Sequence, residues 1–245
     1  MHPWADYLLL ISSIAAGAVT VYQFKLDRPA QLKILNAFTG GYLLCITCLH
    51  LLPELYHVHG EEHAHDHSGI WVGSLILAGF FIQIVLDTIS MGVEHGHAHD
   101  LEHRLPLGVI AGLYLHAFIE AMALGNPEGH HDHASRDLLL WSIVIHNYPV
   151  SIAFLAILFR AGLERRRALT ILGGFALMGP LGMTLSANTP LASHTRELTA
   201  IVIGIFMHIS TTILFESSDL HRFNRGKLVA ILIGTGLGVL TVVFH

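Results

Sequence analysis

Long apolar runs separated by short polar segments dominate the pattern of the chain. Eight such runs lie near residues 7–24, 35–56, 70–91, 106–125, 138–160, 168–187, 198–216 and 228–244. Each is about 20 residues long, which is the length an α-helix needs to cross the hydrocarbon core of a bilayer. Because an open-ended segment satisfies its own backbone in lipid only as a helix, the pattern predicts an all-α integral membrane protein with eight transmembrane helices.

Composition supports this prediction. Of the 245 residues, 53% are hydrophobic and only 13% are Asp, Glu, Lys or Arg, whereas a soluble domain carries about 25% charged residues. Eight spans with short loops use nearly the whole chain, so we expect one transmembrane domain over residues 1–245, with the lipid bilayer as its surroundings. The net charge of −5 gives no indication of a nucleic-acid partner.

The distribution of Lys and Arg predicts the orientation. The segments that follow the first, third, fifth and seventh runs hold 11 of the 13 Lys and Arg residues, and the other side holds only Arg136 and Arg196. Cytoplasmic loops are the ones enriched in these residues, so both termini are expected outside. The lack of Lys and Arg in residues 1–6 argues against a secretory signal peptide, and the compact loops favour a bacterial inner membrane.

The fourth and fifth runs contain polar side chains that are costly in lipid. His116 and Glu120 are four residues apart, on one face of a helix, and His146 and Asn147 lie in the next run at a matching depth below the outer surface. Intramembrane ionisable groups cost about 2.5–3.5 kcal/mol each on insertion scales and mark pathways by default. Imidazole, carboxylate and amide groups in one layer predict a metal site suited to Zn²⁺ and tolerable for Fe²⁺ or Mn²⁺.

Pro149 leaves a second interpretation open for the same residues. A proline within a helix removes the hydrogen bond to the carbonyl four residues earlier, here that of Ile145. The freed carbonyl must find protein, water or an ion. The alternative to a metal site is therefore a kinked helix with interhelical hydrogen bonds between histidine and glutamate.

Further ligand-type side chains extend from this layer towards both surfaces. His50 and Glu54 end the second run near the outer surface, and Glu216 ends the seventh run towards the cytoplasm. His208 and Asp87 lie on the inner half of the seventh and third runs. The loops 57–69, 94–104 and 126–137 are rich in histidine, which is typical of weak, exchangeable metal binding.

Three motifs resemble the ZIP family of zinc- and iron-regulated-type metal transporters. HNYP at 146–149 resembles the HNxPEG motif of the family, HAFIEAMALG at 116–125 resembles its fourth span, and GYLLCITCLHLLPE at 41–54 resembles its second span. Val150 replaces the glutamate of HNxPEG, so the resemblance implies a single-ion site on His116, Glu120, His146 and Asn147. His50 and Glu216 are expected to contact the metal on its way in and out.

The resemblance implies uptake of a divalent ion into the cytoplasm, with Zn²⁺ as the expected cargo and Fe²⁺, Mn²⁺ or Cd²⁺ as alternatives. It also implies that one helix group slides against another around the site, and a homodimer is compatible with it. On this interpretation the protein is a transporter and not an enzyme.

Two other classes of protein remain as alternatives to such a transporter. A membrane di-iron hydroxylase or desaturase would use the histidine clusters at 99–103 and 130–133, but the orientation places these clusters on opposite sides of the membrane. An exporter of the cation-diffusion type usually has six spans and a cytoplasmic C-terminal domain, and here the chain stops at His245 at the end of a run.

Overall fold

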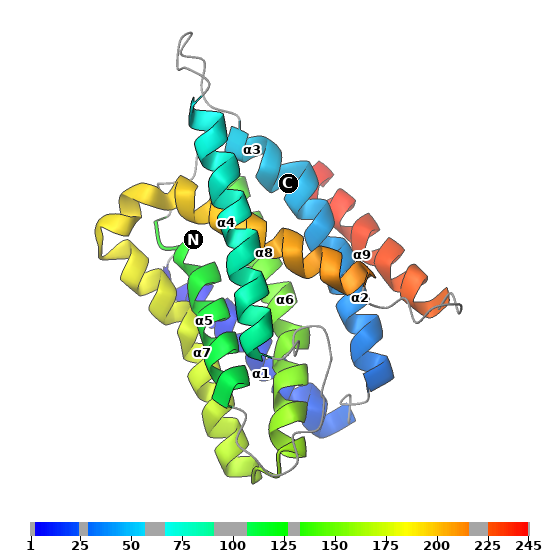
Figure 1. The fold of residues 1–245 in the computed structure, drawn as a ribbon. Coiled ribbons are helices and arrows are strands. Elements are labelled where there is room, and N and C mark those ends of the chain that lie inside the picture. Colours follow the sequence, from blue (N-terminus) through cyan, green and yellow to red (C-terminus); the bar gives the residue numbers. More distant parts are fainter. Residues whose placement is uncertain are drawn as a thin grey trace.

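The computed structural model describes residues 3–24, 29–56, 67–90, 107–126, 133–215 and 225–244. The regular elements in these ranges are all helical (Figure 1), which confirms the all-α class for the described residues. In chain order they are α1 (Pro3–Phe24), α2 (Pro29–Ile46), the π-helix η1 (Thr47–Leu51), α3 (Leu52–Tyr56), α4 (His67–Ser90), α5 (Leu107–Met122), α6 (His133–Arg160), α7 (Arg165–Ala187), the 3₁₀-helix η4 (Pro190–His194), α8 (Thr195–Phe215) and α9 (Arg225–Phe244).

Seven helical segments of the described chain are long and apolar enough to cross a membrane: 4–23, 31–56, 69–90, 135–160, 165–187, 190–215 and 225–244. The eighth expected span corresponds to α5, which has 16 residues and is therefore about 24 Å long at 1.5 Å per residue. It is shorter than the predicted run because the chain turns at 123–125, where Gly125 N–H donates to the carbonyl of Met122 at 3.2 Å.

Two helices begin within segments that were predicted to be histidine-rich loops. The segments 57–69 and 126–137 were expected to be loops, but α4 already begins at His67 and α6 at His133. The first turn of α6 is held by tertiary contacts, since Arg136 is only 3% exposed and donates to Asp6 of α1 at 2.5 Å. A helix can thus continue past its apolar stretch when its polar side chains find partners.

The second span contains a change of helix type. Between α2 and α3, residues 47–51 form η1, and the N–H of Leu52 donates to the carbonyl of Thr47, five residues earlier. Such single π-turns are rare and occur frequently at functional sites. Here the π-turn contains His50 and directly precedes Glu54.

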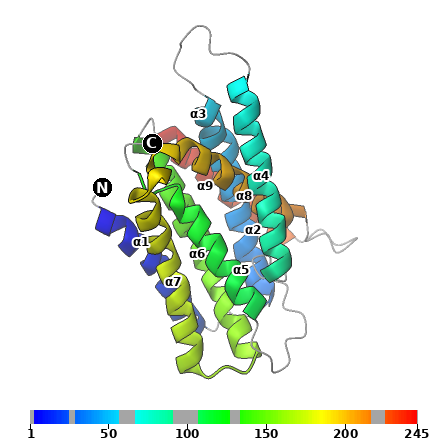
Figure 2. The same cartoon turned by 60° about the vertical axis from the view of Figure 1, so that its left-hand side comes forward.

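The helices pack as two groups. In the first, α1 packs on α6 and α7, and α5 packs on α7; in the second, α2 packs on α9 and α8, and α4 packs on α8. Figures 1 and 2 show α2 running beside α9 and α4 crossing α8. The groups meet where α4 contacts α5 and where α2 contacts α6. The site helices α5 and α6 thus belong to the same group, but α5 packs mainly on α7 and α6 packs mainly on α1.

Glycines bring helix backbones together at several of these contacts, two of which involve α4. In the α4–α8 crossing, Gly79 lies against the carbonyl of Ile201, and Gly204 lies against that of Ile76. On α5, a Cβ added to Gly112 would come within 3.2 Å of the carbonyl of Leu86 on α4. Glycine permits this approach because it has no side chain between the two backbones. The α4 helix is therefore packed closely against both α8 and α5.

Candidate metal centre

The centre begins on one face of α5. His116 and Glu120 are both completely buried, and His116 Nε2 lies 3.3 Å from Glu120 Oε1. The spacing of four residues brings the two side chains together, as neighbours on a helix face do. An ionised carboxylate is costly in a medium without water, so a cation at this position would stabilise the buried pair.

The second helix adds an imidazole to the same point. His146 of α6 is 1% exposed, and its ring centre lies 5.6 Å from that of His116, with the two ring planes at 82°. Ligand atoms of His116, Glu120 and His146 all lie within 4.8 Å of one another. A tetrahedral zinc ion with bonds of about 2.0–2.2 Å needs ligand atoms about 3.3 Å apart, so modest side-chain rotations would close the three around one ion.

Asn147 supplies a further oxygen near this layer. It follows His146 in α6 and is 3% exposed, and its Oδ1 is buried without a hydrogen-bond partner among the described residues. Buried amide oxygens normally have a partner. An amide oxygen in this situation is suited to a cation, and the ligand role of Asn147 stays a prediction.

Pro149 lies inside α6, three residues after His146. Because proline has no N–H, the carbonyl of Ile145 loses its intrahelical donor. The metal site and the helix irregularity predicted for this stretch are therefore compatible with each other.

His50 occupies a separate position towards the end of the second span. Its Nε2 lies 3.3 Å from Glu54 Oε2 and 2.8 Å from Ser135 Oγ of α6. The side chains of His50 and Glu54 are 21% and 23% exposed, in contrast to the buried centre. Among the described His, Cys, Asp and Glu side chains, the group close enough to share an ion contains His116, Glu120 and His146 and does not include His50.

Of the residues predicted for the inner half of the pathway, the structure describes His208 and Asp87 but not Glu216. His208 of α8 and Asp87 of α4 lie 3.8 Å apart, measured from Nε2 to Oδ2. Glu216 lies outside the described residues, as do most of the three histidine-rich loops. The structure therefore brings Asp87 and His208 together.

Two polar contacts were not expected from the sequence, one at the site and one in the first turn of α6. Gln83 of α4 is fully buried, and its Oε1 lies 3.1 Å from His116 Nδ1. Arg136, counted only as a loop charge, lies within α6 and contacts Asp6 and the carbonyl of Leu124. The signal for Gln83 was an amide flanked by apolar residues at 79–82 and 84–86, and an amide is not among the ionisable groups that mark a pathway by default.

Comparison with known proteins identifies the family of the chain. The sequence model of the ZIP zinc transporter family matches residues 7–106 and 94–243. Zinc transporter ZIP9-A of Xenopus laevis is 27% identical, with 74% of this chain and 73% of the relative covered. Zinc transporter ZIP9 of Micropogonias undulatus is 25% identical, with 62% of this chain and 53% of the relative covered.

These comparisons give no support to the di-iron hydroxylase alternative. The family match extends over nearly the whole chain, including both site helices. On this match, and with the buried ligand set in α5 and α6, the chain belongs to the ZIP zinc transporter family.

Proposed function

We propose that this protein carries Zn²⁺ into the cytoplasm through one ion site formed by His116, Glu120 and His146, with Asn147 as a fourth ligand. Zinc as the transported substrate follows from membership of the family. The observation that supports the site is the buried group of three ligand side chains whose donor atoms lie within 4.8 Å of one another.

The donor set favours zinc over harder ions. Two imidazoles and a carboxylate match the nitrogen and oxygen ligands that Zn²⁺ takes in four-coordinate sites, and an amide oxygen completes the set. Fe²⁺, Mn²⁺ and Cd²⁺ are the expected competitors. Val150 is 2% exposed and packs in an apolar cluster of α1, α2, α5, α6 and α7. Because valine offers no carboxylate to bridge a second ion, we propose a single bound ion.

The proposed path enters at His50 and Glu54. This pair is partly exposed, whereas the centre is buried, so it is suited to receive the ion as it loses water. Glu216 is proposed as a ligand on the cytoplasmic side. The affinity of each site must be moderate, because an ion held too firmly would not be released.

Access to the site is proposed to alternate between the two sides. The ligands lie on α5 and α6 of one helix group, and the second group of α2, α4, α8 and α9 packs against it. A movement of one group against the other would close the outer access and open the inner one, as secondary transporters do around a midplane site.

The finer architecture is part of the same proposal. We propose eight spans, with the shorter α5 as the eighth, both termini outside, and a single transporter domain over 1–245 that forms a homodimer. The protein is a multi-pass membrane protein. The relatives are from eukaryotes and do not support the predicted bacterial inner membrane, so the kind of membrane stays a prediction.

Zinc uptake by reconstituted vesicles tests the site. His116→Ala is expected to lower uptake by at least about tenfold, since loss of a ligand weakens binding. His194→Ala is the matched control, because the His194 side chain is 57% exposed and pairs only with the surface residue Glu197 among the described contacts. Uptake by His116→Ala that equals the control would remove His116 from the pathway.

A further inference from the structure

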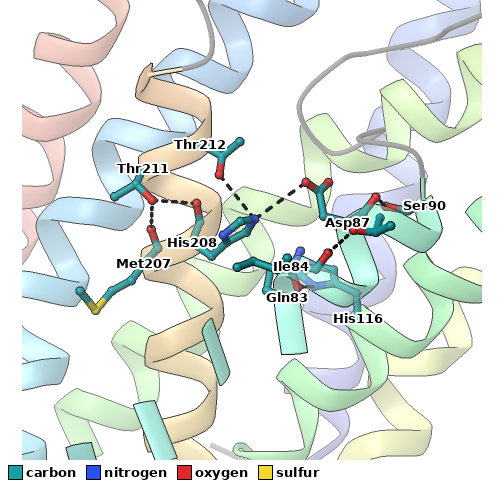
Figure 3. Close-up of polar contacts among 10 residues, drawn as sticks. Gln83, Ile84, Asp87, Ser90, His116, Met207, His208, Thr211 and Thr212 are labelled. Carbon is teal, nitrogen blue, oxygen red and sulfur yellow. Dashed lines mark hydrogen bonds and ion pairs between the residues drawn. The ribbon is translucent and has the colours of Figure 1, made fainter. Parts of the chain in front are cut away.

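Gln83 carries a buried amide, and its neighbours along the helix are apolar. It lies in α4, its exposed fraction is 0%, and the adjacent residues 81, 82, 84, 85 and 86 are all apolar. Placing a polar side chain in such surroundings is costly unless hydrogen bonds compensate. The compensating contact includes the predicted zinc ligand His116, whose Nδ1 lies 3.1 Å from Gln83 Oε1 (Figure 3).

This contact determines which nitrogen of His116 is available to an ion. The Oε1 of an amide only accepts hydrogen bonds, so Nδ1 must carry the hydrogen and donate it. In the neutral ring, Nε2 then holds the lone pair. Nε2 is the atom that lies 3.3 Å from Glu120 Oε1. The arrangement therefore directs a nitrogen lone pair and a carboxylate oxygen towards the same point, which a divalent cation can occupy.

The position of Gln83 is itself fixed by the packing of α4. One helical turn further along, Asp87 lies 3.8 Å from His208 of α8, whose ring stands edge-on against that of Phe80 with the centres 5.0 Å apart. Figure 3 shows Asp87 directed towards His208 and Gln83 beside His116. Together with the glycine crossing of α4 and α8, these contacts fix the rotation of α4 and with it the direction of the amide.

We propose that Gln83 is a positioning residue of the zinc site, holding His116 in the tautomer and orientation in which Nε2 binds the ion. This inference rests on the proposed role of His116. The partners of metal-bound histidines typically orient the ring and raise its basicity, and their loss costs about 10–100-fold in affinity or activity. Gln83 is distinctive because it acts from the helix group that supplies none of the three ligands.

Gln83→Met tests the inference, because methionine matches the length of glutamine and cannot accept the N–H of His116. We expect the apparent KM for Zn²⁺ uptake by vesicles to rise about 10–100-fold, with a smaller change in maximal rate. Gln83→Glu restores an acceptor and is expected to recover most of the affinity. Thr88→Val is the control on the same helix, since Thr88 is exposed and its hydroxyl donates within α4 to the carbonyl of Ile84.

A double-mutant cycle separates positioning from a general structural role. In the His116→Ala background, Gln83→Met is expected to cause no further loss of Zn²⁺ binding, measured by calorimetry on the purified protein in detergent, because the two residues act through one ligand. An equal further loss in that background, or a KM for Gln83→Met like that of Thr88→Val, overturns the inference.

The outcome is distinguishable from failure of the proposed function. If His116→Ala leaves uptake intact, the site itself is wrong. If His116→Ala abolishes uptake while Gln83→Met does not change KM, only the role of Gln83 is wrong. Thermal unfolding of each purified variant identifies any that fails to fold. If Gln83→Met fails to fold, Gln83→Glu still tests the contact with His116, because it keeps a hydrogen-bond acceptor.

Discussion

At the scale of single residues, Glu120 faces the greatest cost of burial at this site. Its side chain has no exposure to solvent and lies beside His116 on the same helix. A charge buried away from water is retained where a counter-ion or a metal stabilises it. A buried carboxylate in this place therefore contributes more to binding a cation than to the stability of the protein without one.

Replacing Glu120 with glutamine separates these two roles. Glu120→Gln keeps the shape but removes the charge, so Zn²⁺ uptake is expected to fall by at least about tenfold, while the unfolding temperature stays equal or rises because no charge has to be desolvated. Uptake of zinc into vesicles and thermal unfolding in detergent measure the two effects. Unchanged uptake together with a lowered unfolding temperature would show that Glu120 is a structural residue.

Local spacing was sufficient to predict part of the site. The four-residue interval of His116 and Glu120 and the matching depth of His146 predicted the group that the structure brings together. Gln83 was not predictable in the same way, because its importance depends on which face of α4 turns towards α5. That rotation is set by contacts between helices far apart in the sequence, which no local pattern records.

At the scale of helices, a buried ion pair joins the N-terminal ends of α1 and α6 to the C-terminal end of α5. Arg136 of α6 donates to Asp6 of α1 at 2.5 Å and to the carbonyl of Leu124, just after α5, at 3.3 Å. Asp6 is fully buried and Arg136 is 3% exposed. The pair links three helices of one group and so supports the position of both site helices.

Removing one partner of this ion pair is expected to destabilise the protein more than removing both partners. Arg136→Met leaves the Asp6 carboxylate buried without its cation and is expected to lower the free energy of unfolding by about 3–5 kcal/mol. The double variant Asp6→Asn with Arg136→Met is expected to regain much of this loss. Unfolding titrations in detergent measure both, with the exposed Arg166→Ala as control. A double variant less stable than Arg136→Met would contradict this account.

Helix ends were predicted to within three residues and helix starts to within six, since apolar runs of this length have few alternatives in a bilayer. The early starts of α4 and α6 were missed because apolar patterning does not detect a polar first turn that is held by partners elsewhere. The π-turn η1 was missed for a related reason. Its extra residue changes no hydrophobic pattern, and only the backbone hydrogen bonds reveal it.

At the scale of the whole molecule, the centre lies near the meeting of two helix groups. The three proposed ligands come from α5 and α6, and α4 of the other group contacts His116 through Gln83. The sequence could match the depth of the two site helices but not their neighbours, because pairing of α5 with α7 and of α1 with α6 depends on the fit of surfaces.

The orientation of the protein can be tested by labelling cysteines from one side. Ser193, in the exposed turn between α7 and α8, is expected outside, and Glu164, in the exposed turn between α6 and α7, is expected inside. With Cys45 and Cys48 replaced by alanine, a membrane-impermeant maleimide added to intact cells should label Ser193→Cys at once. It should label Glu164→Cys only after the cells are opened. The reverse pattern would invert the topology.

The π-turn η1 has a consequence for the length of the second span. A π-turn holds one residue more than an α-turn, so η1 acts as a one-residue insertion in a continuous helix. Deleting Leu49, whose side chain is 53% exposed, would remove this extra residue and let an ordinary α-turn form, so α3 would keep its direction relative to α2. A residue deleted from α2 itself, where no wide turn takes up the change, would instead rotate His50 and Glu54 by about 100° and turn them away from Ser135. The wide turn is thus the place in this span where the chain can lose a residue without changing the direction in which this pair faces.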